Sequence, residues 1–438
     1  MENQEEFDRL VAPIRKTTWR FYAIIAPLIA IVAVGVYAYY VQFTTGLGVT
    51  GMNNYVSWGF YISNFVFFIG VSHAGTLISA ILRVSGAEWR KPITRMAESI
   101  TVIAISIGAL FPLIDLGGPL RILNLFAYGR IQSAILWDFI SIATYLTGSL
   151  LYLFLPLIPD LAAIREQQVG GPFRRRLYGF LSMRWKASPG QKRRLKRGIA
   201  IMAVLIIPIA VSVHTVVSWI FGMTLRVGWH STILGVYFVG GAILSGIATI
   251  IIAMAIFRRA YHLERWIKPS HFRNLGLLML VMELVLLYFT LSEYLTAAYG
   301  SESADSAWLG SLAFGPYAYL FWGMVAGGFL APVFILALTR VKSVAWLVTA
   351  AVMIDVGMWF ERFLIVVPAM ATPQMPVSWG TYTPTWVEWS ITAGAFAGFA
   401  LLYAVFSKLF PLVSIWEVSE ETPVTEPVPR PAGEEVTP

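Results

Sequence analysis

The chain has 438 residues, of which 57% are hydrophobic and 13% charged, and its mean hydropathy is +0.69. This composition excludes a soluble enzyme and indicates a protein that crosses a membrane several times. The net charge of +8 follows from membrane topology and does not predict a nucleic-acid partner. The sequence contains no cysteine, which excludes disulfides, iron–sulfur clusters held by thiolates and a cysteine nucleophile.

Ten apolar segments are long enough to cross a bilayer, which takes about 20 residues in a helix. The strands of a β-barrel are shorter, about 9 to 11 residues, and alternate in polarity. We therefore expect an all-α integral membrane protein. The ten segments are 21–42, 56–83, 97–116, 134–157, 198–222, 231–257, 274–298, 315–338, 343–368 and 387–408.

The order of these segments predicts two four-helix bundles with two peripheral helices. Residues 56–222 would form the first bundle from helices two to five, and residues 231–368 the second from helices six to nine. The first helix (21–42) and the tenth (387–408) would be peripheral. The two bundles would share one orientation, which is the arrangement that an internal duplication produces.

The distribution of Lys and Arg predicts that both termini lie in the cytoplasm. In this orientation the inner segments hold 28 of the 32 basic residues, the excess that membrane proteins keep on the cytoplasmic side. Residues 1–20 would be a cytoplasmic N-terminus without a cleavable signal peptide, and residues 159–197 a basic cytoplasmic loop. The tail 417–438 is rich in Pro and Glu, which predicts a disordered cytoplasmic segment.

Ionisable side chains inside the spans are the candidates for function, because each costs at least a few kcal/mol to place there. Under the predicted topology three of them lie near the middle of the membrane: His73, Glu283 and Asp355. Six others lie in its outer third: Asp115, Asp138, His214, Glu293, Glu361 and Arg362.

Structural explanations for some of these residues stay open. Glu361 and Arg362 would also suit an ion pair that holds helices together. Asp115 is flanked by Pro and Gly, as a helix cap often is. His214 would also suit a simple bond to a neighbouring group, and His230 a position at the membrane interface.

The histidines do not predict haem. A di-haem cytochrome needs four axial ligands in facing pairs, whereas the spans contain His73 and His214, which we expect at different depths. No HExxH or cysteine-rich motif predicts a metal site.

Several stretches together resemble one known family. They are "GVSHAGTLISAILRVSGAEWRKPITRMAES", "LFPLIDLGGP", "IPIAVSVHTVVSWIFGMTLRVGWHSTILGVYFVGGAILSG", "LSEYLTAAYG" and "MWFERFLIVV". These stretches are spread over most of residues 50–370. They are similar to the NrfD/PsrC-like family of quinone-interacting membrane subunits and, within it, to the ActC subunits of alternative complex III.

The resemblance implies a chain that carries no haem, iron–sulfur cluster or metal itself and oxidises a quinol, expected to be menaquinol. The quinol would bind in the first bundle near the outer face. Electrons would pass to a peripheral iron–sulfur subunit of the molybdopterin-like type and then to multihaem cytochrome c subunits. A second NrfD-like membrane subunit is a further expected partner, and the bacterial inner (cytoplasmic) membrane is the expected location.

Within this framework, we expect His214 and Asp138 to accept the protons that the quinol releases, with His73 as a deeper relay. The expected quinol-binding residues are Tyr61, Asp115, Trp137, Trp219 and His230. The expected proton pathway of the second bundle, which would couple the reaction to proton translocation, consists of Glu283, Glu293, Asp355, Glu361 and Arg362.

Three other functions are compatible with such a chain. The same site would serve quinone reduction if electrons flowed the other way. A proton-coupled secondary transporter would also have ten helices and buried carboxylates, but the sequence lacks the paired Gly- or Pro-interrupted segments that mark many transporter sites. A simple membrane anchor would not explain why ionisable residues gather in one layer.

Overall fold

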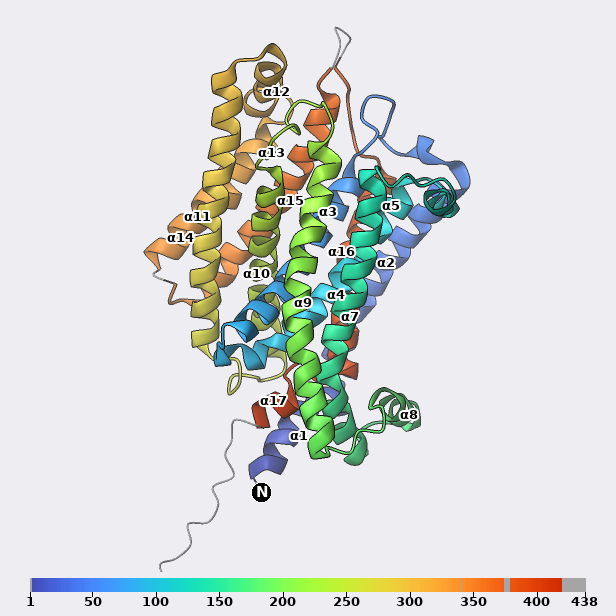
Figure 1. Ribbon diagram of the computed structural model, residues 1–438, viewed down its shortest axis with the longest axis vertical. Helices are drawn as coiled ribbons and strands as arrows, with labels where there is room; N and C mark the ends of the chain where they lie inside the picture. The colour runs from blue at the N-terminus through green and yellow to red at the C-terminus, as the bar shows by residue number, and fades with distance from the viewer. Residues whose placement is uncertain (1, 340, 374–378, 420–438) are drawn as a thin grey trace, which may run out of the picture.

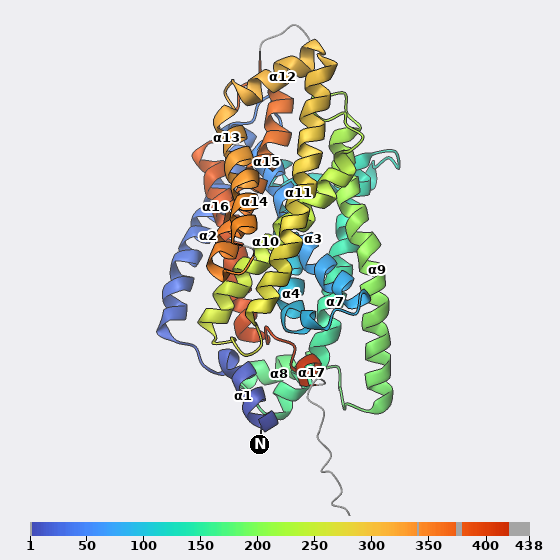
Figure 2. The same ribbon diagram turned by 90° about the vertical axis from the view of Figure 1, so that its left-hand side faces the viewer.

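The computed structural model describes residues 2–339, 341–373 and 379–419. Over these residues the chain forms helices joined by turns and loops, and it contains no strand. Most of the long helices run along the long axis of the molecule (Figures 1 and 2). The predicted all-α class is therefore confirmed.

Long apolar helices make up most of the molecule. They are α2 (Trp19–Thr45), α3 (Phe60–Val84), α4 (Lys91–Gly108) followed by α5 (Leu110–Asp115), α7 (Ala134–Glu166), α9 (Pro189–Gly222), α10 (Leu234–Ala260), α11 (Pro269–Gly300), α15 (Val344–Ala371) and α16 (Trp386–Leu409). A further span runs through α13 (Ala318–Trp322), the π-helical η4 (Gly323–Leu330) and α14 (Ala331–Leu338). The shorter elements are α1 (Glu2–Arg15), η1 (Leu47–Val49), η2 (Glu88–Arg90), η3 (Pro119–Ile122), α6 (Leu123–Ala127), α8 (Pro172–Leu181), α12 (Ser303–Ala313) and α17 (Ile415–Ser419).

Nine helical segments within the described ranges are long and apolar enough to cross a membrane. They correspond to the predicted spans except the ninth, which is α15. This helix has 28 residues and carries Asp355, Glu361 and Arg362, but it is not among the nine. The exact count of ten spans in two separate bundles therefore stays a prediction.

Helix α3 is the centre of the packing. It contacts α4, α9, α10, α15 and α16, and nearly all of its described side chains are buried. Its sequence suits this position, because it is apolar all round and includes small residues that allow close helix contact. Helices α2 and α16 pack against each other, and α16 also contacts α3 and α4; the peripheral placement of the first and tenth helices stays a prediction.

Gly75 sets the close approach of α3 to α4. A Cβ atom at this position would lie 1.9 Å from the carbonyl oxygen of Ala97 and 2.3 Å from Oγ1 of Thr101. Gly75→Ala is expected to force the helices apart and to cost about 1 to 3 kcal/mol of stability, as overpacking does. Thermal unfolding of the purified chain in mild detergent measures this loss.

Gly327→Ala is the matched control, since a Cβ at Gly327 meets nothing within 4 Å. It is expected to unfold at the temperature of the wild type. Equal unfolding temperatures for the two variants would show that the α3–α4 contact is not tight.

The two ends of the described chain meet at one end of the molecule. Helix α1 contacts both α16 and α17, near the label N in Figure 1. Lys408, in the last turn of α16, donates to the carbonyl oxygens of Pro13 and Lys16 at 3.0 and 3.1 Å. The tail that the sequence predicts to be disordered begins at Glu417, but residues 417–419 belong to α17; residues 420–438 lie outside the described ranges.

Candidate functional site

A pocket of about 470 Å³ lies among α3, α5, α7 and α9. Its walls include the aromatic side chains of Trp58, Phe65 and Phe221, and the loop between α5 and α7 contributes Arg121 and Tyr128. The ring of Trp58 packs edge-on against Phe221, with the centroids 5.8 Å apart. A flat apolar molecule would find a fixed aromatic wall here.

Two carboxylates line this pocket, which we name the Asp115–Asp138 pocket. Asp115 is the last residue of α5, and Asp138 lies in the first two turns of α7. Asp138 is only 7% exposed. In each carboxylate, Oδ1 is shielded from solvent and has no hydrogen-bond partner. Such buried acceptors are costly unless a donor satisfies them, so the pocket suits a ligand that brings hydroxyl groups.

The two histidines of the spans form a buried pair. Nδ1 of His214 lies 3.1 Å from Nε2 of His73, and the ring centroids are 3.8 Å apart. Both side chains are fully buried. The sequence-based expectation that they lie at different depths is wrong. Counting residues along each helix separately failed because it does not include how α3 and α9 pack against each other.

The surroundings of His73 leave room for an additional proton. Its Nδ1 lies 2.8 Å from the carbonyl oxygen of Ile69, and its Nε2 lies 2.6 Å from that of Ala210. A neutral imidazole has a single N–H, so it can donate to only one of these two carbonyl groups. Nε2 of His214 has no partner. The ring nitrogens of the pair therefore have acceptors within hydrogen-bond distance at His73 and a free position at Nε2 of His214.

The other expected quinol-binding residues do not line the Asp115–Asp138 pocket. Tyr61 donates to Oε1 of Gln42 at 2.5 Å, inside the helix packing. Trp219 and His230 line a different cavity of about 610 Å³ between α9 and α10. Trp137 contacts Trp219, with ring centroids 6.4 Å apart. Of the predicted set, the structure brings Asp115 to Asp138 and His73 to His214.

The residues of the expected proton pathway fall into three places. Glu361 and Arg362 form an ion pair of 3.0 Å, and each side chain is 1% exposed. The Arg362 guanidinium also lies over the ring of Phe238 at 5.0 Å. Glu283 is fully buried, neither of its carboxylate oxygens has a partner, and it is within electrostatic reach of Glu361.

Asp355 and Glu293 lie away from that group. Asp355 accepts a hydrogen bond from Thr249 of α10 at 2.9 Å. Glu293 accepts from Ser231 at 2.6 Å and lines a surface cavity with Asp305.

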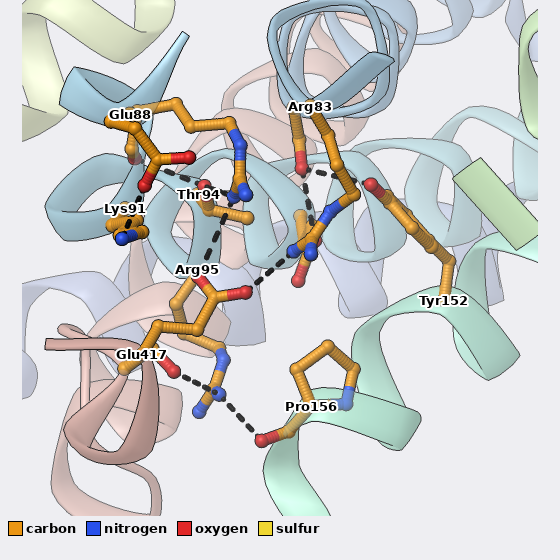
Figure 3. A network of polar contacts seen from close by, with 12 residues as sticks. Arg83, Glu88, Lys91, Thr94, Arg95, Tyr152, Pro156 and Glu417 are labelled. Carbon is orange, nitrogen blue, oxygen red and sulfur yellow. Dashed lines mark hydrogen bonds and ion pairs between the residues drawn. The ribbon is translucent and has the colours of Figure 1, made fainter. Parts of the chain in front are cut away.

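Sequence reasoning missed a network of buried charges near the C-terminal end of α3 (Figure 3). Arg95 pairs with Asp160 of α7 at 3.0 Å, and the two side chains are 1% and 0% exposed. Arg83 pairs with Glu417 of α17 at 2.6 Å, and Arg90 lies 3.6 Å from the same carboxylate. The predicted spans 56–83 and 97–116 leave Arg90 and Arg95 in the loop between them, but α4 begins at Lys91 and contains Arg95.

A buried acid lies beside this network. Glu98 accepts from Ser79 at 3.0 Å, and its Oε2 has no partner. The hydroxyl group of Tyr152 lies 3.3 Å from the same serine oxygen. Arg95 and Glu98 are three residues apart, so they lie on nearly the same side of α4. That spacing is the sequence signal for the network.

Residues 48–374 match the family model described as "Polysulphide reductase, NrfD". A putative dimethyl sulfoxide reductase membrane subunit of Halobacterium salinarum is 27% identical over 410 residues, which cover 88% of this chain and 89% of that protein. A selenate reductase subunit of Mesobacillus selenatarsenatis is 24% identical over 413 residues, covering 90% and 94%. An Hdr-like menaquinol oxidoreductase integral membrane subunit of Archaeoglobus fulgidus is 24% identical over 426 residues, covering 92% and 97%. The family model covers most of the chain, which is therefore a multi-pass membrane protein of the NrfD family.

Proposed function

We propose that this chain is the quinol-oxidising membrane subunit of an electron-transfer complex. The proposal rests on one observation. Asp115 and Asp138 line the same aromatic pocket, and each has a carboxylate oxygen that is shielded from solvent and lacks a hydrogen-bond partner. A quinol has an apolar ring with two hydroxyl groups, so its ring suits the walls and its hydroxyls suit the two acceptors.

The chemistry requires groups that accept protons. Oxidation of a quinol to a quinone releases two protons and two electrons, and each hydroxyl proton needs a base within hydrogen-bond reach. Asp115 and Asp138 are the first acceptors in this proposal. The His73–His214 pair serves as the next proton store in this proposal, and the two carbonyl oxygens within hydrogen-bond distance of the His73 ring support that role. The two electrons leave for an iron–sulfur partner subunit on the outer face.

The names of similar proteins support the substrate class. The archaeal relative from Archaeoglobus is called a menaquinol oxidoreductase subunit, so menaquinol is the proposed substrate. Two others are named as subunits of reductases, and a reductase of an external acceptor needs a donor such as quinol. Quinone reduction at the same pocket is the second candidate, because the partners' potentials set the direction of electron flow.

The quoted motifs support a finer assignment. We propose a subunit of the ActC type in an alternative complex III, in the bacterial inner membrane with both termini in the cytoplasm. Its partners would be a molybdopterin-like iron–sulfur subunit, multihaem cytochrome c subunits and a second NrfD-like membrane subunit.

Proton translocation by the second group of helices is part of the same proposal. Glu283 has two unpartnered oxygens near the Glu361–Arg362 pair, an arrangement that supports loading and release of a proton under the control of the arginine. Asp355 and Glu293 would extend the path towards mid-membrane and the outer rim.

Substituting either pocket carboxylate tests the proposal. Asp115→Asn and Asp138→Asn keep the shape of the side chain but cannot take a proton, so each is expected to slow quinol oxidation by about tenfold to a hundredfold. The measurement is steady-state turnover of the assembled complex with a soluble menaquinol analogue. Glu302→Gln, an exposed carboxylate beyond α11, is the control and is expected to leave turnover unchanged. Normal turnover in both aspartate variants, with partner cofactors intact, would refute the site.

A further inference from the structure

A second cleft, which we name the Asp355 cleft, opens on other helices. It has a volume of about 500 Å³ and lies between α3, α10, α15 and α16. No residue that lines it also lines the Asp115–Asp138 pocket. Its lining is apolar except for Thr249, Asp355 and Thr392.

Only one of the two carboxylate oxygens of Asp355 has a hydrogen-bond partner. Its Oδ2 accepts from Oγ1 of Thr249 at 2.9 Å, whereas its Oδ1 is shielded from solvent and has no partner. Thr249 fixes the orientation of the carboxylate, so Oδ1 is the acceptor left for a ligand. A shielded acceptor among aromatic rings carries a desolvation cost that a bound donor would relieve.

Aromatic rings form the walls of the Asp355 cleft. Phe68 and Phe396 face each other with ring centroids 5.0 Å apart, and Trp359 and Trp389 complete the lining. Trp389 and Val356 are 53% and 48% exposed, respectively. These two residues belong to long apolar helices, so the exposed side of the cleft faces lipid and a molecule dissolved in the bilayer can enter.

We propose that the Asp355 cleft binds a second molecule of the quinol class, with one hydroxyl group donating to Oδ1 of Asp355. The choice of ligand rests on the proposed function, while the site rests on its own geometry. A lipid acyl chain would fit the walls but brings no donor. A cationic headgroup would bring a donor but would pay the cost of leaving water. A planar, neutral, hydroxylated ring satisfies both the walls and the acceptor.

A count of bound ligand tests this inference. The probe is a fluorescent hydroxyquinoline N-oxide, a quinol analogue, titrated into the purified full chain in lipid nanodiscs. The wild type is expected to bind two equivalents. Asp355→Asn is expected to weaken one of them by about tenfold to a hundredfold, because the single amide oxygen keeps the bond from Thr249 and the ligand hydroxyl then faces the amide NH2 group in place of a buried acceptor. Ala393→Trp, which fills the cleft from α16 and leaves Asp355 in place, is expected to abolish that same equivalent.

The outcomes separate this inference from the proposed function. Asp138→Asn is expected to weaken only the other equivalent. If Asp138→Asn has no effect while Ala393→Trp removes one equivalent, the Asp355 cleft binds the analogue and the Asp115–Asp138 pocket does not. If the wild type binds a single equivalent that depends on Asp138, or if Ala393→Trp retains two, the cleft does not bind quinol. Unfolding temperatures close to that of the wild type exclude general misfolding as the cause of a loss.

Discussion

His73→Gln is expected to lower quinol oxidation by up to about a hundredfold, the lower end of what a positioned base contributes, because the proton store behind the two carboxylates is lost. The amide of Gln keeps hydrogen-bonding groups among the same neighbours but cannot take up a proton. His214→Gln is expected to have a similar effect, because its Nδ1 lies 3.1 Å from the His73 ring. The double variant is expected to be no slower than either single one, since groups that act as a unit give non-additive losses. Turnover of the assembled complex measures all three.

Tyr145→Phe provides the control for the histidine pair. The ring of Tyr145 packs on His73 at 4.6 Å, and its hydroxyl donates to the carbonyl oxygen of Ser72 at 2.9 Å. Removing the hydroxyl disturbs the packing beside His73 without removing a base, so turnover is expected to stay near that of the wild type. Turnover within a few-fold of normal in both single histidine variants would show that the pair is structural.

Arg95→Met is expected to destabilise the protein by about 3 to 5 kcal/mol, the cost of leaving one partner of a buried ion pair alone. The substitution leaves Asp160 without its ion-pair partner. Asp160 is fully buried and also accepts hydrogen bonds from the backbone N–H groups of Ile415 and Trp416 at 3.1 and 2.9 Å. The carbonyl oxygen of Pro156 and the hydroxyl of Ser414 lose a donor as well. A large fall in the unfolding temperature and a loss of assembled complex are the expected measurements.

The exposed pair Arg9–Glu5 supplies the matched comparison. Nη2 of Arg9 lies 2.6 Å from Oε1 of Glu5, but the side chains of Arg9 and Glu5 are 57% and 67% exposed. Arg9→Met is expected to change stability by less than about 1 kcal/mol, because water screens an exposed pair. If Arg95→Met unfolded at the temperature of Arg9→Met, the buried network would not stabilise the fold.

The helical class and the position of most spans could be predicted because hydrophobic length is a direct consequence of bilayer thickness. Family membership could be predicted as well, from stretches that combine His73, His214 and Glu361 with their neighbours. The candidate residues Asp115 and Asp138 could be named individually, since a charge in an apolar span is conspicuous.

Pairing between helices could not be predicted from the same information. The contact of His73 with His214 depends on how two helices of unequal length cross, and no residue count fixes that. The separation of Tyr61, Trp219 and His230 from the carboxylate pocket has the same origin. The sequence gives the type of each side chain. The direction in which the side chain points depends on the rotation of its helix, which tertiary packing sets.

The buried arginines escaped prediction for a different reason. Basic residues at the inner end of a span usually remain in water, and this rule assigns Arg90 and Arg95 to a loop. The structure buries both because acids from distant parts of the chain meet them. Asp160 and Glu417 supply these acids, and the pairing of Arg83 with Glu417 spans 334 residues.

That pairing has a consequence for the biosynthesis of the chain. Helices α3 and α4 leave the ribosome early, yet the acid that neutralises Arg83 and Arg90 is among the last described residues to be made. The charges at the junction of α3 and α4 therefore stay incompletely paired until synthesis reaches α17. A chain that stops before Glu417 retains excess positive charge at a position that the complete fold keeps out of water. Such long-range closure delays the final packing step.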